Sequence, residues 1–346
     1  IGIGVTIGYG VNQLTFGMHQ ITNWDWLVTN GKPSLTALSL AVIFLTLAAM
    51  LSALSGIGRG IRWLSNLNMA LSWLLLVIFI IFGATAFAGE MFIAGLTEYL
   101  GAIPAMSVTI WDGGKTDIAQ ALSDWQSAWT IFYWAWWIAF TPFVGLFLAR
   151  VSRGRTIREY VVGAILLPSL MCFAWFCIIG GTALDLELSG AAGGDILEAD
   201  LSAQLFATVE NLFTAQWVLP VATLCVVLLI TYLVTSADSA VLVINTIVSG
   251  GAPDGVRARH IVLWSVLLGL VIITLLFAGG MDALRSVMII GALPFSAVML
   301  FMLCALGLQN SCSLAPCCLN RGLLCSLYST SNLSLKFNIM YFFHFG

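Results

Sequence analysis

Residues 129–159 read WTIFYWAWWIAFTPFVGLFLARVSRGRTIRE, and the interpretation of the whole chain starts from this stretch. It begins as an apolar, aromatic-dense segment that is long enough for a helix to cross a bilayer. Its character is broken at Pro142, and it ends in four arginines, Arg150, Arg153, Arg155 and Arg158. Aromatic ring faces carry negative quadrupole potential, so such a segment inside a membrane can hold a cation without a formal counter-charge.

The composition of the whole chain is that of a membrane protein. Of its 346 residues, 60% are hydrophobic and only 8% are charged, whereas soluble domains carry roughly 25% charged residues. The net charge of −3, without a basic patch outside short loops, argues against a nucleic-acid partner. Neither GxSxG nor a phosphate-binding loop followed by GK[ST] is present. We therefore expect no enzymatic activity and no cofactor.

Apolar stretches of about 20 residues recur along the chain, and each can span a hydrocarbon core about 30 Å thick. We predict an all-α polytopic membrane protein with about eight transmembrane helices. The expected spans are residues 1–21, 35–54, 68–87, 127–149, 157–181, 212–248, 261–278 and 286–308. Residues 90–107 are interrupted by Glu90, Glu98, Gly101 and Pro104, which favours an interfacial amphipathic helix over a further crossing.

Basic residues predict the orientation of these spans. Arginines gather in alternate loops, while the intervening loops carry only Lys32, Lys115 and Arg285. By the positive-inside rule the arginine-bearing loops are cytoplasmic. An even number of spans then places both ends of the chain on the cytoplasmic side.

The two ends of the sequence are atypical. The chain begins at Ile1 within a Gly-rich apolar segment, so we expect a sequence truncated at its N-terminus. Residues 309–346 show no periodicity and cluster Cys and Ser. The most economical interpretation is a frameshifted or intron-derived extension. The alternative is a genuine but disordered terminus.

At helical spacing the aromatic side chains sort into rows. One face carries Trp129, Tyr133, Trp137 and Phe140, and the adjacent row carries Phe132, Trp136 and Phe143. Aromatic rows in membrane helices usually serve packing or interfacial belts, which cluster at the ends of a span. Trp134, Trp136 and Trp137 instead lie well inside the span, so packing and cation binding both stay open.

Asp238 is the one acid that we place deep in an apolar run, ITYLVTSADSAVLV. A carboxylate inside a membrane is a functional candidate because its desolvation is costly. The hydroxyls of Thr235, Ser236 and Ser239 are hard oxygen donors of the kind that sodium accepts. Alternatively they bond back to helix carbonyls, while Asp238 pairs with Arg150 at the cytoplasmic end. The two interpretations are compatible, with hydroxyls holding an ion and Asp238 and Arg150 forming a gate.

Linked motifs across residues 1–308 resemble the betaine/carnitine/choline transporter family. They are GYGVNQ, LSALSGIGRGIRWLSNLNM, the aromatic stretch, IGGTALDLE and VTSADSA. The resemblance implies a secondary transporter whose core is two inverted five-helix repeats, as in leucine-transporter-like symporters. Residues 1–126 would then hold the last three helices of the first repeat and the interfacial helix. Residues 127–308 would be the complete second repeat, and residues 309–346 the aberrant tail.

The resemblance also implies roles for particular residues. Trp137 matches the family's substrate-caging tryptophan and Trp136 its pathway neighbour, with Tyr133 and Phe140 completing the expected aromatic set. Phe140 stands where some members have tryptophan. Thr235, Ser236 and the Tyr232 carbonyl match sodium ligands, and Phe143 and Thr6 lie at a second sodium site.

The resemblance further implies a small substrate such as glycine betaine, choline or carnitine. It implies sodium as the coupling ion, a lipid bilayer as the environment, a homotrimer, and the bacterial inner membrane as the location. The family's third and fourth helices, which complete the cage, are not in this sequence. We therefore expect the isolated 346-residue chain to transport nothing.

Two other classes of membrane protein remain as alternatives. In a structural or regulatory subunit, the aromatic residues would only pack helices. An ion channel is disfavoured because the sequence has no repeated selectivity-loop motif and no charged ring.

Overall fold

The computed structural model describes residues 2–55, 62–114, 116–152, 154–249 and 258–314. Nearly all of this is helix. The α-helices are α1 (Gly2–Thr22), α2 (Leu35–Ser55), α3 (Arg62–Phe82), α4 (Thr85–Met106), α5 (Asp117–Trp125), α6 (Phe132–Val151), α7 (Ile157–Val161), α8 (Leu167–Trp175), α9 (Gly181–Leu188), α10 (Asp195–Glu198), α11 (Gln204–Leu212), α12 (Ala215–Val248) and α13 (Ala258–Leu314).

Three short π-helical turns join some of these helices into longer ones. They are η2 (Gln126–Ile131), η3 (Val162–Leu166) and η4 (Phe176–Gly180). A two-stranded hairpin, β1 (Val28–Thr29) and β2 (Lys32–Pro33), lies between α1 and α2. Asn30 and Gly31 both have positive φ, as a two-residue hairpin loop requires.

Five helices in the described residues are long and apolar enough to cross a membrane: Leu35–Ser55, Arg62–Phe82, Ile157–Leu188, Ala215–Val248 and Ala258–Leu306. The predicted spans 1–21 and 127–149 are also helical, as α1 and as η2 with α6. These findings support the all-α membrane class. The predicted tail lies outside the described residues from position 315 onward.

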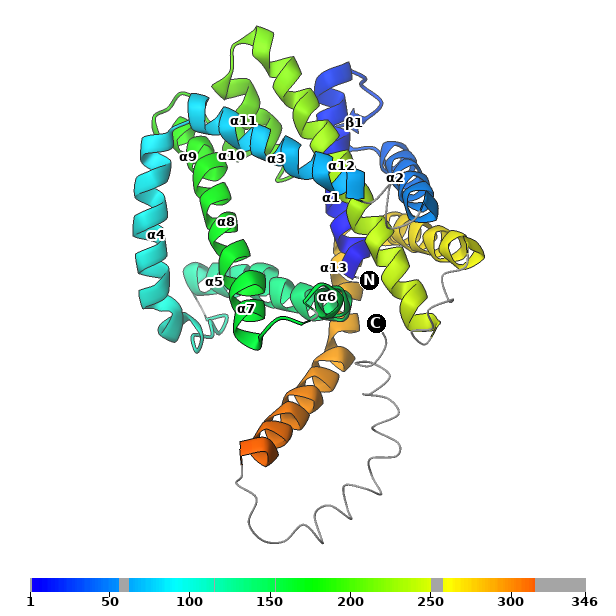
Figure 1. The fold of residues 1–346 in the computed structure, drawn as a ribbon. Coiled ribbons are helices and arrows are strands. Elements are labelled where there is room, and N and C mark those ends of the chain that lie inside the picture. Colours follow the sequence, from blue (N-terminus) through cyan, green and yellow to red (C-terminus); the bar gives the residue numbers. More distant parts are fainter. Residues whose placement is uncertain (1, 56–61, 115, 153, 250–257, 315–346) are drawn as a thin grey trace, which may run out of the picture.

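The core forms where α1 packs against α12, α2 and α13. In Figure 1, α1 and α12 run beside each other at the centre of the molecule. Glycines on α1 permit this close approach. A Cβ atom at Gly10 would lie 2.2 Å from Leu233 Cδ2 of α12, and one at Gly8 would lie 2.5 Å from Leu284 Cδ1 of α13. A side chain at either position would therefore force the facing leucine to move.

The helix α13 is interrupted between the seventh and eighth predicted spans. Gly280 has φ 62° and ψ −139°, a conformation that only glycine adopts readily. The chain changes direction there, and Arg285 therefore lies within helical chain rather than in a loop. The last part of α13 extends away from the rest of the molecule (Figure 1).

The helix α4 covers the segment that the sequence predicted to be interfacial. It begins at Thr85, earlier than expected, because α3 ends at Phe82 and the chain bends at Gly83. Only Ala88 is buried, where α4 meets α9 and η4. Figure 1 shows α4 standing apart from α1 and α12.

Candidate functional site

A single continuous helix, formed by α5, η2 and α6, positions the aromatic residues of the site. The helix α6 continues through Pro142 to Val151, in agreement with the expected span of residues 127–149. The Thr141 hydroxyl donates to the Trp137 carbonyl oxygen at 2.8 Å, one residue before the proline. The aromatic side chains therefore project from one uninterrupted helical frame, and their spacing decides which neighbours they meet.

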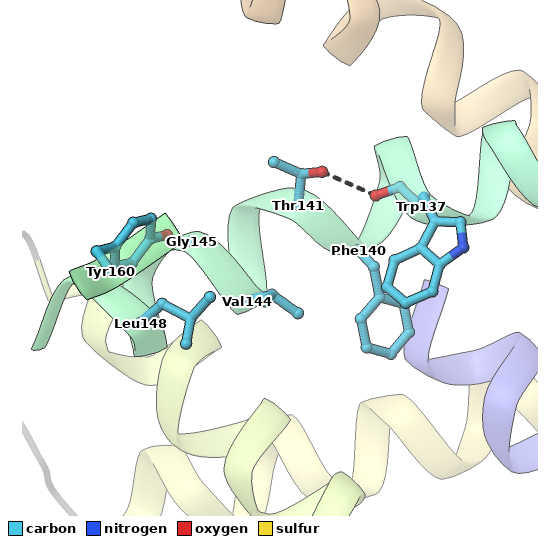
Figure 2. A pocket seen from close by; sticks show the side chains of 7 residues that line it. All are labelled: Trp137, Phe140, Thr141, Val144, Gly145, Leu148 and Tyr160. Atoms are coloured by element: carbon cyan, nitrogen blue, oxygen red, sulfur yellow. Dashed lines mark hydrogen bonds between the residues drawn. The ribbon is translucent and has the colours of Figure 1, made fainter. Parts of the chain in front are cut away.

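Trp137 and Phe140 border a shallow apolar depression of about 160 Å³. In Figure 2 the two rings lie at one end of the depression, and Leu148 and Tyr160 lie at the other. All of its lining residues belong to α6 except Tyr160 of α7: Trp137, Phe140, Thr141, Val144, Gly145, Leu148 and Tyr160. Trp137 is 65% exposed, so the described residues leave much of its indole uncovered.

Phe140 also touches α1. A Cβ atom at Gly2 would lie 2.9 Å from Phe140 Cδ2. The ring is thus wedged between α1 and the depression, whereas the neighbouring Trp137 indole is not. Trp134, which does not line the depression, is exposed to a similar extent, at 68%.

The other two predicted substrate-binding residues, Tyr133 and Trp136, lie in a separate aromatic cluster. The Trp136 ring stacks on Tyr9 of α1, with centroids 5.8 Å apart and planes inclined by 18°. Phe132 contacts both of these rings, at 5.4 Å from Trp136 and 6.0 Å from Tyr9. Tyr133 lies 5.8 Å from Trp136 and stacks on Trp129 at 5.9 Å. The structure therefore divides the predicted set into two groups on α6.

A cation already lies on this second cluster. The guanidinium carbon of Arg285 is 5.4 Å from the Tyr9 ring centroid and 5.2 Å from that of Phe132. Arg285 Nε donates to the Tyr9 hydroxyl. The sequence placed Arg285 in an outer loop and missed this contact, as it missed Tyr9. The sequence offered one weak sign that Arg285 lies in a helix: it stands shortly after two glycines and just before an apolar run.

The predicted sodium-binding residues lie mainly on α12. Thr235 Oγ1 donates to the carbonyl oxygens of Thr231 and Tyr232, each at 3.0 Å. Ser236 is half-buried beside it. Thr6 on α1 donates to the Gly2 carbonyl oxygen at 3.3 Å. The Phe143 side chain lies outside the described residues. Thr235 thus makes the helix back-bond that the alternative interpretation expected, and Thr6 makes one of the same kind on α1.

Asp238 is fully buried, and hydroxyl groups surround its carboxylate. Ser52 Oγ of α2 donates to one carboxylate oxygen at 2.6 Å, and Ser239 Oγ donates to the other at 3.1 Å. Ser52 was not predicted from the sequence, since its contact with Asp238 joins residues 186 positions apart. The Arg150 side chain, the predicted gate partner, lies outside the described residues. Asp238 therefore links α2 to α12 through Ser52.

A family model and individual relatives all match this chain to one family of transporters. The model of the betaine/carnitine/choline family transporters matches residues 1–311. The glycine betaine transporter OpuD of Bacillus subtilis is 34% identical over 307 residues, which are 88% of this chain and 56% of that protein. A glycine betaine/proline/choline transporter of Vibrio parahaemolyticus is 33% identical over 300 residues, 86% of this chain and 50% of that protein.

An ectoine/hydroxyectoine transporter of Virgibacillus pantothenticus is 33% identical over 310 residues, which are 88% of this chain and 57% of that protein. The chain spans about half the length of the curated relatives it matches.

Proposed function

This chain belongs to the betaine/carnitine/choline transporter family, and from that premise we propose that it functions in a secondary active transporter. The solute would be a small quaternary-ammonium compound of the betaine type. The names of two relatives support this class, since they cite glycine betaine and choline, which both carry a trimethylammonium group. Transport would proceed by alternating access, with the helices of one inverted repeat rocking against the other.

The observation that carries this proposal is the exposed indole of Trp137 beside Phe140 at the apolar depression on α6. A permanently charged methylated nitrogen cannot donate a hydrogen bond, so ring faces and apolar walls are its natural partners. A cation–π contact with tryptophan contributes about 2 kcal/mol or more when the cation is desolvated. The neighbouring cluster of Tyr133 and Trp136 would line the approach to this contact.

We further propose that sodium drives the transport. Thr235 Oγ1 and the Tyr232 carbonyl oxygen lie 3.0 Å apart, so both hard oxygens can turn to one ion. Ser236 would add a second hydroxyl. Thr6 and Phe143 would contribute to a second sodium site. Because sodium must displace the hydrogen bond that Thr235 makes to its own helix, binding would couple to a local change in α12.

Asp238 and Arg150 would form a cytoplasmic gate in this scheme. A buried carboxylate with two hydroxyl partners still gains from a cation. Exchanging the two charges tests the pairing: uptake lost in either single reversal should return in part in the double reversal. A double reversal as inactive as the singles would remove the gate.

The location and assembly follow from the same premise. The relatives are bacterial proteins, so we place the protein in the bacterial inner membrane with about eight crossings, by the length of apolar helix that a bilayer needs. The family resemblance also suggests a homotrimer.

Uptake in membrane vesicles tests the function. The protein is expressed from its complete gene, and vesicles are given radiolabelled glycine betaine with an inward sodium gradient or an equal potassium gradient. Glycine betaine should accumulate inside the vesicles above its external concentration with the sodium gradient but not with the potassium gradient. Uptake that is equal in both salts would contradict sodium coupling. No uptake of glycine betaine, choline or carnitine in either salt would contradict the transporter assignment.

A further inference from the structure

Arg285 occupies a position on the aromatic cluster that a substrate ammonium group would favour. Its guanidinium carbon lies within 5.4 Å of the Tyr9 and Phe132 ring centroids. Trp136 contacts both of these rings. Only one aromatic ring therefore separates the guanidinium from Trp136, a predicted substrate-binding residue of the same cluster.

The guanidinium has hydrogen-bonding capacity to spare. Arginine carries five N–H donors in a planar fork. Within the described residues, the structure gives this group two polar partners, the Tyr9 hydroxyl on Nε and Asp282 at 3.9 Å from Nη1. The Asp282 side chain is 92% exposed, so the ion pair with it is weak. The Arg285 side chain is itself 34% exposed and reachable by a small solute.

A fixed positive charge beside an aromatic cation site discriminates between solutes. It repels a solute that carries only a positive charge, because like charges at short range in a partly buried site interact strongly. It attracts a solute that also carries a carboxylate, because the guanidinium fork binds carboxylates by charge-assisted hydrogen bonds.

We propose that Arg285 is a specificity-determining residue that binds the carboxylate of a zwitterionic solute while an aromatic face of α6 holds the ammonium group. The transporter then selects betaine-like zwitterions against choline-like cations. This inference rests on the proposed function and adds to it the substrate class and the residue that sets it.

Arg285 of α13 also contacts Tyr9 of α1. A contact that only holds the two helices together would produce no preference between solutes. A purely structural role would change uptake of both solute classes alike. The ratio of their affinities is therefore the readout that separates recognition from packing.

The experiment uses glycine betaine and choline, which share the trimethylammonium group and differ in the carboxylate. The protein expressed from its complete gene is assayed in vesicles for the KM of glycine betaine and for its inhibition by choline. In the wild type, glycine betaine should bind more tightly than choline. Arg285→Gln should reduce this preference by about tenfold or more, as expected for the loss of a charge-assisted hydrogen bond. Arg285→Lys should retain most of it.

Two further variants guard against a folding defect. Arg285→Met keeps the aliphatic packing without the charge and should lose the preference as Arg285→Gln does. Tyr9→Phe removes the hydroxyl but keeps the charge, and should leave the preference within about twofold because the guanidinium stays on the ring face.

The outcomes separate this inference from the proposed function. Uptake of neither solute by the wild type contradicts the transporter assignment and, with it, this inference. A wild type that prefers choline overturns the inference alone. The inference alone is also overturned if Arg285→Gln and Arg285→Met transport both solutes with the wild-type ratio of affinities for glycine betaine and choline.

Discussion

The guanidinium of Arg285 lies over the Tyr9 ring, 5.4 Å from its centroid, and its Nε donates to the Tyr9 hydroxyl. The two residues are 276 positions apart in the sequence. Their contact joins α1 to the second part of α13 and places both against α6. The same contact therefore fixes the aromatic cluster and holds the core helices together.

Replacing Tyr9 by leucine should destabilise the protein. The change removes the stack on Trp136 and the hydrogen bond from a charged donor, which together contribute about 2–4 kcal/mol. Thermal unfolding in detergent, followed by tryptophan fluorescence, measures the loss. Tyr99→Leu is the control, because Tyr99 makes an aromatic contact with Phe173 at the exposed helix α4. An equal shift in both variants would show that the Arg285 contact adds nothing.

Replacing Gly10 by alanine should disrupt the contact between α1 and α12. The new Cβ would lie 2.2 Å from Leu233 Cδ2 and 2.7 Å from Cδ1, so the buried leucine must move. Overpacking of this kind costs about 1–3 kcal/mol. Gly89→Ala on α4, where no atom lies within 4 Å of the new Cβ, should be neutral or stabilising. Thermal unfolding in detergent distinguishes them, and a neutral Gly10→Ala would mean that α1 and α12 are less tightly packed.

The apolar segments predicted the all-α membrane class, because that class depends on local composition. In the structure, Gly8 and Gly10 of α1 leave room for the neighbouring helices. The start of α4 at Thr85 did not follow, since it depends on where α3 ends and the chain bends at Gly83. The expected span 127–149 did include Pro142, and a proline is tolerated in a membrane helix where neighbouring groups satisfy the carbonyl that loses its hydrogen bond.

Replacing Ser52 by alanine should destabilise the pairing of α2 with α12. Asp238 would lose the hydroxyl that donates to it at 2.6 Å and would keep only the bond from Ser239. Leaving a buried carboxylate short of a donor costs about 1–3 kcal/mol. Asp238→Asn in the same background should recover part of the loss by removing the charge. If the double variant is less stable than Ser52→Ala alone, the cost has another origin.

Replacing Thr235 by alanine should raise the sodium concentration that gives half-maximal uptake, because one proposed oxygen ligand is lost. An increase of about tenfold corresponds to the contribution of a single charged interaction. Thr223→Ala is a matched control on the same helix, since its hydroxyl also bonds to a carbonyl one turn earlier, that of Leu219 at 2.7 Å. A sodium dependence that shifts equally in both variants would remove Thr235 from the ion site.

The site was predictable only as far as helical spacing reaches. The spacing placed Trp137 and Phe140 on one face, and both do line the depression. It grouped Tyr133 with them, but Tyr133 lies with Trp136 in the other cluster. Tyr9, Arg285 and Ser52 were missed because each meets its partner from a distant part of the chain. Only the packing of helices determines such contacts.

Trp137 is proposed to hold the ammonium group of the solute, and Trp134 provides its matched control. Both indoles project from α6 and are similarly exposed, at 65% and 68%. The decisive measurement is equilibrium binding of radiolabelled glycine betaine to the purified protein, expressed from its complete gene, in sodium. Trp137→Ala should weaken the Kd by about tenfold or more, the equivalent of one desolvated cation–π contact, and Trp134→Ala should change it less than about twofold. Equal changes in the two variants would contradict the account.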